Sequence, residues 1–198
     1  HLAEIGRLPI HVIDTHVNGG RITADDVRAR TMSATRRGRV GLVAVDYFQD
    51  MARLRGRERA SVTEEQEERA AILHDTAVGA DVPMIVVSSM NKGGQRAQGR
   101  EGKSADNTDA RGAGLDYASD VMAFLTRPED GDLGDGRRRV RFEVTKSRYG
   151  MTGAVNLIFD MRRGLFLPDT HHGEFAAPGP EDRYGDDYGY TAPGGEAE

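Results

Sequence analysis

The apolar positions of the first half of the chain fall into short continuous runs separated by polar segments. Segments 40–46 and 82–88 are almost wholly apolar, and 10–14 is a shorter apolar run that ends in an aspartate. Uninterrupted apolar runs of this length are typical of strands that are covered on both faces, as in parallel sheets. Pro83 lies at the start of the third run, where its missing N–H removes no central hydrogen bond. We therefore predict three buried strands.

Two of the segments that follow these runs have helix signatures. Segment 23–37 begins with Thr23 as a predicted N-cap, has two aspartates in its first turn, and stops before a glycine. The second helix is predicted to open with Thr63 and Gln66, which have the spacing of a capping box, and to run to about Ala77.

The second half of the chain predicts consecutive strands. Segments 120–126, 140–146 and 154–159 are strand-like, and a glycine-rich turn at 149–153 joins the last two as a hairpin. Strands that first alternate with helices and then follow one another indicate an α/β fold with a mainly parallel sheet and antiparallel C-terminal strands. The long polar, glycine-rich stretch 91–114 has no hydrophobic period, as expected for a functional or disordered loop.

The predicted parallel strands end in polar residues, at the edge of the sheet where ligands bind in this class of fold. These residues are Asp14, Asp46, Ser88 and Ser89. Segment 42–46 has four apolar residues followed by an aspartate, which is the Walker B pattern. A carboxylate at this place can orient Mg²⁺, usually through water, although the same aspartate could simply cap the following turn.

Composition limits the class of protein. The chain has 198 residues, 37% hydrophobic and 30% charged, and no apolar run approaches the roughly 20 residues that cross a bilayer. It has no cysteine, which excludes disulfides and thiolate metal sites and fits a reducing, cytoplasmic setting. Segment 168–198 holds eight acidic residues and one basic residue, so a net charge of −5 conceals a slightly basic remainder. We predict a domain over 1–167 and an acidic, disordered tail over 168–198.

Several motifs in order along the chain resemble those of DnaB-like replicative DNA helicases. Asp46-Tyr47-Phe48-Gln49 is similar to the family's Asp-Tyr-Leu-Gln, and segment 146–153 is close to its Lys-x-Arg-x-Gly-x-Thr-Gly. Further similarities lie at 8–14, 23–37, 82–88, 111–114 and 120–122. The resemblance extends to about residue 167.

The resemblance implies the C-terminal half of a RecA-like, three-layer ATPase domain that is incomplete at its N-terminus. It implies an ATP-dependent, ring-shaped helicase that translocates on single-stranded DNA and unwinds the duplex at the replication fork. ATP and Mg²⁺ are the implied cofactors. The implied partners are single-stranded DNA, further copies of the chain in a homo-hexamer, primase and a helicase loader. No membrane association is implied.

The resemblance also implies roles for individual residues. Asp46 supports Mg²⁺, and Gln49 and Ser89 belong with it to the catalytic set. Lys146 and Arg148 reach the γ-phosphate that the adjacent subunit binds. Their spacing of two places both on one face of a strand, where they could instead be part of a solvated edge strand.

For DNA contact, the resemblance implies the loop around Arg111, Gly112 and Gly114. The stretch before it adds four basic residues, Lys92, Arg96, Arg100 and Lys103. Without interleaved aromatic residues, contact is expected to be electrostatic and not by base stacking. The alternative is a solvated loop with incidental charge.

The sequence departs from the family in ways that bear on activity. No Gly-x-x-x-x-Gly-Lys-Ser/Thr phosphate-binding loop is present, and the family's catalytic glutamate is absent, so this chain alone is expected not to hydrolyse ATP. Ser89 stands where the family has a γ-phosphate-sensing glutamine, and Gly112 stands where it has a glutamate. A non-hydrolysing, DNA-binding or ring-accessory paralogue that supplies an arginine finger in trans is therefore the alternative function. A RecA-like recombinase or clock-type ATPase is disfavoured by the two quoted motifs.

Overall fold

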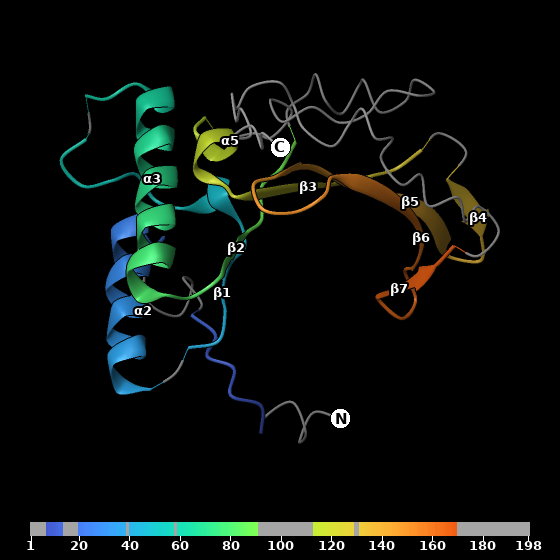
Figure 1. Ribbon diagram of the computed structural model, residues 1–198, viewed down its shortest axis with the longest axis horizontal. Coiled ribbons are helices and arrows are strands. Elements are labelled where there is room, and N and C mark those ends of the chain that lie inside the picture. The colour runs from blue at the N-terminus through green and yellow to red at the C-terminus, as the bar shows by residue number, and fades with distance from the viewer. Residues whose placement is uncertain are drawn as a thin grey trace, which may run out of the picture. The chain divides into compact units, whose positions relative to one another are not determined.

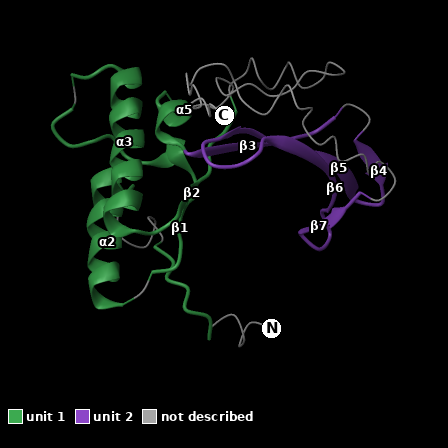
Figure 2. Ribbon diagram, in the orientation of Figure 1, with its two compact units in different colours: residues 1–91, 110–119 green, residues 92–109, 120–198 purple. Residues whose placement is uncertain are grey.

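The computed structural model divides the chain into two compact units, residues 1–91 with 110–119 and residues 92–109 with 120–198 (Figures 1 and 2). The residues that the structure describes are 7–13, 20–38, 40–57, 59–90, 113–128 and 131–169. Among these, no helix is both long enough and apolar enough to span a membrane.

The first unit contains a parallel pair of strands, β1 (Val43–Val45) and β2 (Met84–Val86). Hydrogen bonds continue past the strand ends, because the Val87 N–H donates to the Val45 carbonyl at 2.9 Å and the Phe48 N–H donates to the Val87 carbonyl at 2.8 Å. Both strands lie inside the predicted runs and are shorter than those runs. Two of the three predicted buried strands are thus confirmed, and they are parallel.

Helix α2 (Ala24–Arg37) confirms the first predicted helix. Its N-cap is Thr23, whose hydroxyl accepts from the Asp26 N–H at 3.1 Å, and the Asp26 carboxylate accepts from the Thr23 N–H at 2.9 Å. These hydrogen bonds hold the pKa of Asp26 below its ordinary value. The helix ends at Gly38, as the sequence predicts.

Helix α3 (Val62–Ala80) begins earlier and ends later than predicted. Its N-cap is Ser61, which forms a capping box with Glu64, so the prediction of Thr63 and Gln66 as the box was wrong. The reason is that Ser61 offers the same hydroxyl two residues earlier, followed by a glutamate at the third helical position. The helix ends at Asp81, which adopts a left-handed conformation with φ of 52°.

The core of the first unit lies between the strand pair and these two helices (Figure 1). Val45 and Phe48 pack with Ala24, Val27 and Leu73. The opposite side chains of the strands are not covered by any described element, and Ile85 is 54% exposed. The prediction that both faces are covered is therefore wrong for the described residues, because both helices pack on one face.

The predicted strand at 10–14 is not formed within the described residues. Ile10 is 61% exposed and Val12 is 84% exposed, and the Ile10 N–H donates to the nearby Leu8 carbonyl. An apolar run becomes a buried strand only if a neighbouring strand pairs with it, and neither β1 nor β2 does so here. Asp14 lies outside the described residues.

The second unit is a five-stranded antiparallel sheet in the order β3-β5-β6-β7, with β4 paired to β5. Its strands are β3 (Val121–Thr126), β4 (Asp132–Gly134), β5 (Arg137–Ser147), β6 (Gly153–Asp160) and β7 (Leu165–Pro168). This confirms the three predicted strands and the hairpin of the second half. Strands β4 and β7 were not predicted, so the antiparallel part is larger than expected.

The described structure extends two residues into the segment that was expected to be a disordered tail. Strand β7 ends at Pro168, and Asp169 is buried, where its carboxylate accepts from the Arg139 Nε at 2.9 Å. The remainder of the predicted tail, 170–198, lies outside the described residues. The expected boundary at residue 168 thus falls inside a strand.

Candidate functional site

Asp46 follows β1 directly at its carboxyl end, and its side chain is exposed. The register pairs Val45 with Val86, so Ser88 and Ser89 emerge from the neighbouring strand at the same edge of the sheet. The described residues contain no cluster of three or more side chains that could hold a metal ion by themselves. A single exposed carboxylate fits Mg²⁺, which keeps most of its water shell and is usually held by one or two carboxylates together with phosphates.

Gln49 joins the ends of the two strands. It lies on the short 3-10 helix η1 (Phe48–Asp50), and its Nε2 donates to the Ser88 hydroxyl at 2.8 Å. Its Oε1 accepts from the Ser89 N–H at 3.2 Å. The structure thus brings together residues that the sequence predicts at this site, from the ends of two different strands.

Helix η1 is fixed to α3 through Phe48. The Phe48 ring is fully buried, and its carbonyl accepts from the Arg69 Nη1 at 3.1 Å. The Arg69 guanidinium also lies over the Phe48 ring, 5.3 Å from its centroid. The turn that carries Asp46 and Gln49 therefore has a rigid attachment on its helix side.

Arg69 is itself held by a buried carboxylate. Glu65 accepts from the Arg69 Nη2 at 2.6 Å and from the Arg53 Nε at 2.6 Å. Burial alone would raise the pKa of Glu65, but the hydrogen bonds from Arg53 and Arg69 outweigh it and lower the pKa. Sequence reasoning missed this network, although the spacing of four between Glu65 and Arg69 is a signal for a helical ion pair.

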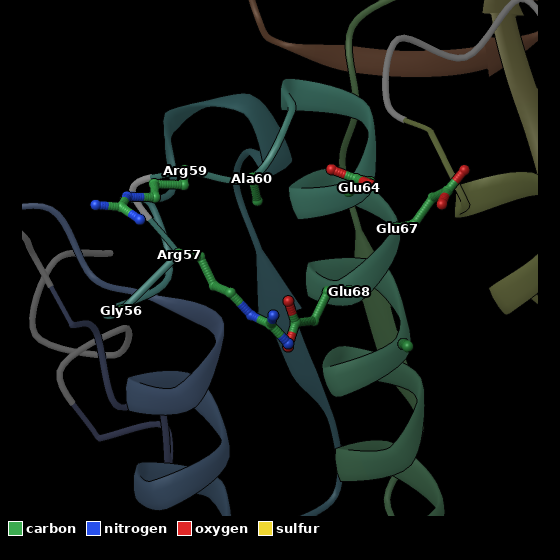
Figure 3. A pocket seen from close by; sticks show the side chains of 8 residues that line it. Gly56, Arg57, Arg59, Ala60, Glu64, Glu67 and Glu68 are labelled. Atoms are coloured by element: carbon green, nitrogen blue, oxygen red, sulfur yellow. The ribbon is translucent and has the colours of Figure 1, made fainter.

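Two arginines of the basic segment 53–59, Arg53 and Arg57, form ion pairs with carboxylates of α3. Arg57 donates to the Glu68 carboxylate at 2.7 Å, and this hydrogen bond raises the pKa of Arg57. A hollow between this segment and the start of α3 is lined by Gly56, Arg57, Arg59, Ala60, Glu64, Glu67, Glu68 and Ala71. Figure 3 shows Arg57 reaching toward Glu68 while Arg59 points away from it. The hollow therefore mixes both signs of charge and is not a uniform anion-binding surface.

Gly114 is the residue of the predicted DNA-binding set that the structure describes. It has φ of +83°, and a Cβ at this position would lie 2.8 Å from the Glu67 Cα. The neighbouring Ala113 N–H donates to the Gln66 Oε1 at 3.1 Å, and the short helix α5 (Leu115–Ala118) follows. The structure thus gives Gly114 a packing role, close against α3. The other predicted DNA contacts, Lys92, Arg96, Arg100, Lys103, Arg111 and Gly112, lie outside the described residues.

Lys146 and Arg148 belong to the second unit. Lys146 lies on β5 opposite Met122 of β3, whereas Arg148 follows the last residue of β5. Arg148 donates two hydrogen bonds to Asp120. Its Nη1 donates to the Asp120 carboxylate at 3.1 Å, and its backbone N–H donates to the Asp120 carbonyl at 2.9 Å. Arg148 thus follows directly on the strand that carries Lys146, and a shared face for the two side chains stays a prediction.

The fold is that of a RecA-like ATPase domain. The chain is similar to a solved ATPase domain, with a TM-score of 0.70 and 22% identity, over 84% of this chain and 57% of that one. It is equally similar to a DnaB-like replicative helicase whose structure was described with its interactions with primase, with a TM-score of 0.70 and 22% identity, over 84% of this chain and 39% of that one.

Within this class, residues 1–167 match the family described as the DnaB-like helicase C terminal domain, and the chain belongs to this family. It is 26% identical to the replicative DNA helicase DnaB of Mycobacterium intracellulare over 167 residues, which are 83% of this chain and 27% of that protein. It is 26% identical to the replicative DNA helicase DnaC of Bacillus subtilis over 148 residues, which are 74% of this chain and 32% of that protein. The chain thus spans about a third or less of the length of these two curated relatives.

Proposed function

We propose that this chain is part of an ATP-dependent, ring-shaped replicative DNA helicase that translocates on single-stranded DNA and unwinds the duplex at the fork. The observation that carries the proposal is the cluster at the shared end of β1 and β2. There Asp46 stands beside Ser88 and Ser89, to which Gln49 is bonded. This cluster lies within a chain whose residues 1–167 match the DnaB-like family.

In this function Asp46 holds Mg²⁺ through water, next to the phosphates of ATP. The ion neutralises charge on the phosphate oxygens when it is bound. The exposed position of Asp46 at a strand end supports this role, because both water and a nucleotide can reach the carboxylate. The phosphate-binding loop and catalytic glutamate are not in this sequence, so hydrolysis depends on residues that it does not contain.

Lys146 and Arg148 act on ATP bound by the neighbouring subunit of a homo-hexamer. Arg148 is 40% exposed and its partner Asp120 is 47% exposed. Exposed ion pairs of this kind contribute only about 0–1 kcal/mol, so Arg148 can exchange the carboxylate for a phosphate at little cost. Asp120 orients the guanidinium until the phosphate arrives.

On the DNA side, we propose that Arg111, Gly112 and Gly114 hold the phosphates of single-stranded DNA. The basic residues Lys92, Arg96, Arg100 and Lys103 add to this contact. Binding of this kind weakens steeply as the salt concentration rises, because phosphate contacts release counterions. Primase and a helicase loader are the further proposed partners.

The test is Arg148→Ala in the full-length protein. Steady-state ATP turnover is expected to fall about 10³-fold or more, which is the usual contribution of a positioned arginine. Equilibrium nucleotide binding should stay within a few-fold of wild type, because the neighbouring subunit's own site holds the nucleotide. Arg162→Ala is the matched control, since Arg162 is also an exposed arginine of this unit paired to an exposed carboxylate, Asp135, at 3.3 Å.

Unchanged turnover in Arg148→Ala would remove the trans-acting role. A wild-type protein that binds single-stranded DNA but has no turnover would instead favour the non-hydrolysing paralogue. The two candidates differ in the phosphate-binding loop, which only the helicase requires. The coding sequence upstream of His1 discriminates further, because an in-frame loop of this type belongs only to the helicase.

A further inference from the structure

The side-chain amide of Gln49 is a two-point link between the carboxyl ends of β1 and β2. Its nitrogen donates a hydrogen bond to the Ser88 hydroxyl at 2.8 Å, and its oxygen accepts one from the Ser89 N–H at 3.2 Å. Both partners are 39 or 40 positions away along the chain and belong to the neighbouring strand. The two bonds therefore fix the position of η1 relative to the end of β2.

The backbone of η1 is fixed independently of this amide. The Phe48 N–H donates to the Val87 carbonyl at 2.8 Å, and the Phe48 carbonyl accepts from buried Arg69 at 3.1 Å. The Phe48 ring is fully buried in the core. Loss of the Gln49 amide therefore leaves the turn attached to the core and removes two cross-strand hydrogen bonds.

We infer that Gln49 is a positioning residue that couples the nucleotide site at Asp46 to the segment that begins at Ser89. Gln49 is three positions from Asp46 along the chain, and Ser89, whose N–H it binds, lies two residues before the polar stretch 91–114 with the predicted DNA contacts. If binding of Mg²⁺ and nucleotide moves the turn at Asp46, the two hydrogen bonds of the amide transmit that movement to Ser88 and Ser89. This inference rests on the proposed function.

Coupling between two sites means that one ligand changes the affinity for the other. If Gln49 carries this effect, its removal separates the two binding events without abolishing either. A residue with a merely structural role would lower stability, or would weaken both affinities together. The decisive quantity is thus the ratio of DNA affinities measured with two different nucleotides, and not any single affinity.

The experiment uses the full-length protein with the substitution Gln49→Leu, which keeps the side-chain size and removes both hydrogen bonds. Affinity for fluorescein-labelled oligo-dT is measured by anisotropy with Mg²⁺ and a non-hydrolysable ATP analogue, and again with Mg²⁺ and ADP. In the wild type the ratio of the two affinities is expected in the usual range of about 5–150-fold. In Gln49→Leu we expect the ratio to fall below about 2-fold, as for the loss of a coupling free energy.

Two variants make the result specific. Gln49→Glu should retain coupling, because a carboxylate can accept from both the Ser88 hydroxyl and the Ser89 N–H. Thr76→Val removes one buried hydrogen bond in the same unit, from the Thr76 hydroxyl to the Ile72 carbonyl at 2.6 Å, and should keep the wild-type ratio despite a lower Tm. If Gln49→Leu does not fold, Ser88→Ala removes one of the two partners and should lower the ratio part of the way.

A wild-type ratio in Gln49→Leu, or in Ser88→Ala where that variant is used, overturns the inference and leaves the proposed function intact. The inference is also overturned if Gln49→Leu, while as stable as Thr76→Val, loses the same factor of oligo-dT affinity with both nucleotides. A wild-type protein that binds neither nucleotide nor oligo-dT refutes the proposed function, and the inference falls with it. The wild-type measurement therefore separates the two failures.

Discussion

Gly114 gives a sharp test of whether the chain approaches α3 as closely as the structure has it. The residue combines two constraints, a φ of +83° and a backbone position from which a Cβ would lie 2.8 Å from the Glu67 Cα. Substitution by alanine violates both constraints at once. Gly56 supplies the control, because it has φ of +75° and nothing within 4 Å of its Cβ position.

The two constraints contribute separately to the free energy of unfolding. An alanine forced into the left-handed region costs about 1–2 kcal/mol, and this part applies to Gly56→Ala and Gly114→Ala alike. Inserting a methyl group into a packed contact costs a further 1–3 kcal/mol or so, and this part applies to Gly114→Ala alone. Because the contacting atom is backbone and not the end of a flexible side chain, the upper half of that range is expected.

Urea unfolding of the two variants, followed by far-UV circular dichroism, measures the difference directly. Gly114→Ala should have the lower free energy of unfolding of the two by about 2–3 kcal/mol, which is the overpacking contribution alone. Equal losses would refute the close approach to Glu67, whatever their size. A stable Gly114→Ala that binds single-stranded DNA poorly would place the importance of the glycine in DNA contact and not in packing.

Two further predictions concern α3. Ser61→Ala should lower the free energy of unfolding by about 1 kcal/mol through loss of the cap, whereas Thr63→Ala should change it by less than about 0.5 kcal/mol, as for an ordinary surface position; equal effects in thermal unfolding would contradict the assigned cap. The folded pKa of Glu65 lies below its unfolded value, so its stabilisation is complete above the unfolded pKa and is lost as the pH falls through the folded pKa. At neutral pH, Glu65→Gln should lower the free energy of unfolding by about 3–5 kcal/mol, because buried Arg69 loses its ionised partner. Measured from pH 6 downward, the variant's free energy of unfolding should then fall less steeply than that of the wild type. Parallel pH curves would exclude Glu65 as a source of the acid sensitivity.

Elements with local causes could be predicted from the sequence. Helix α2 begins where Thr23 and Asp26 satisfy each other three residues apart, and it ends at a glycine, so its signal is contained in one segment. The β5–β6 hairpin is similar, because its turn residues and alternating strands adjoin in sequence. Asp46 could be proposed as a site residue for the same reason, since a Walker B pattern is a continuous run.

Features that depend on distant partners could not be predicted. The bonds from Gln49 to Ser88 and Ser89 cross from one strand to another, and no local pattern specifies which side chains meet there. Residues 10–13 have the composition of a strand, but a strand also needs a neighbour to pair with. The shift of the α3 cap from Thr63 to Ser61 has a different cause, because two hydroxyl residues competed within one turn.

Burial sets how much free energy it costs to separate Arg139 and Arg148 from their carboxylate partners. Arg139 is 15% exposed against a carboxylate, Asp169, that is 1% exposed, so separating this pair would leave a buried charge without its partner at a cost of about 3–5 kcal/mol. Arg148 and its partner Asp120 are both exposed, and their separation costs about 0–1 kcal/mol. Counting basic residues cannot make this distinction, since both arginines lie in or next to the same strand, β5. In the proposed function, exchanging Asp120 for an incoming phosphate therefore costs Arg148 little, whereas the ion pair of Arg139 is costly to break.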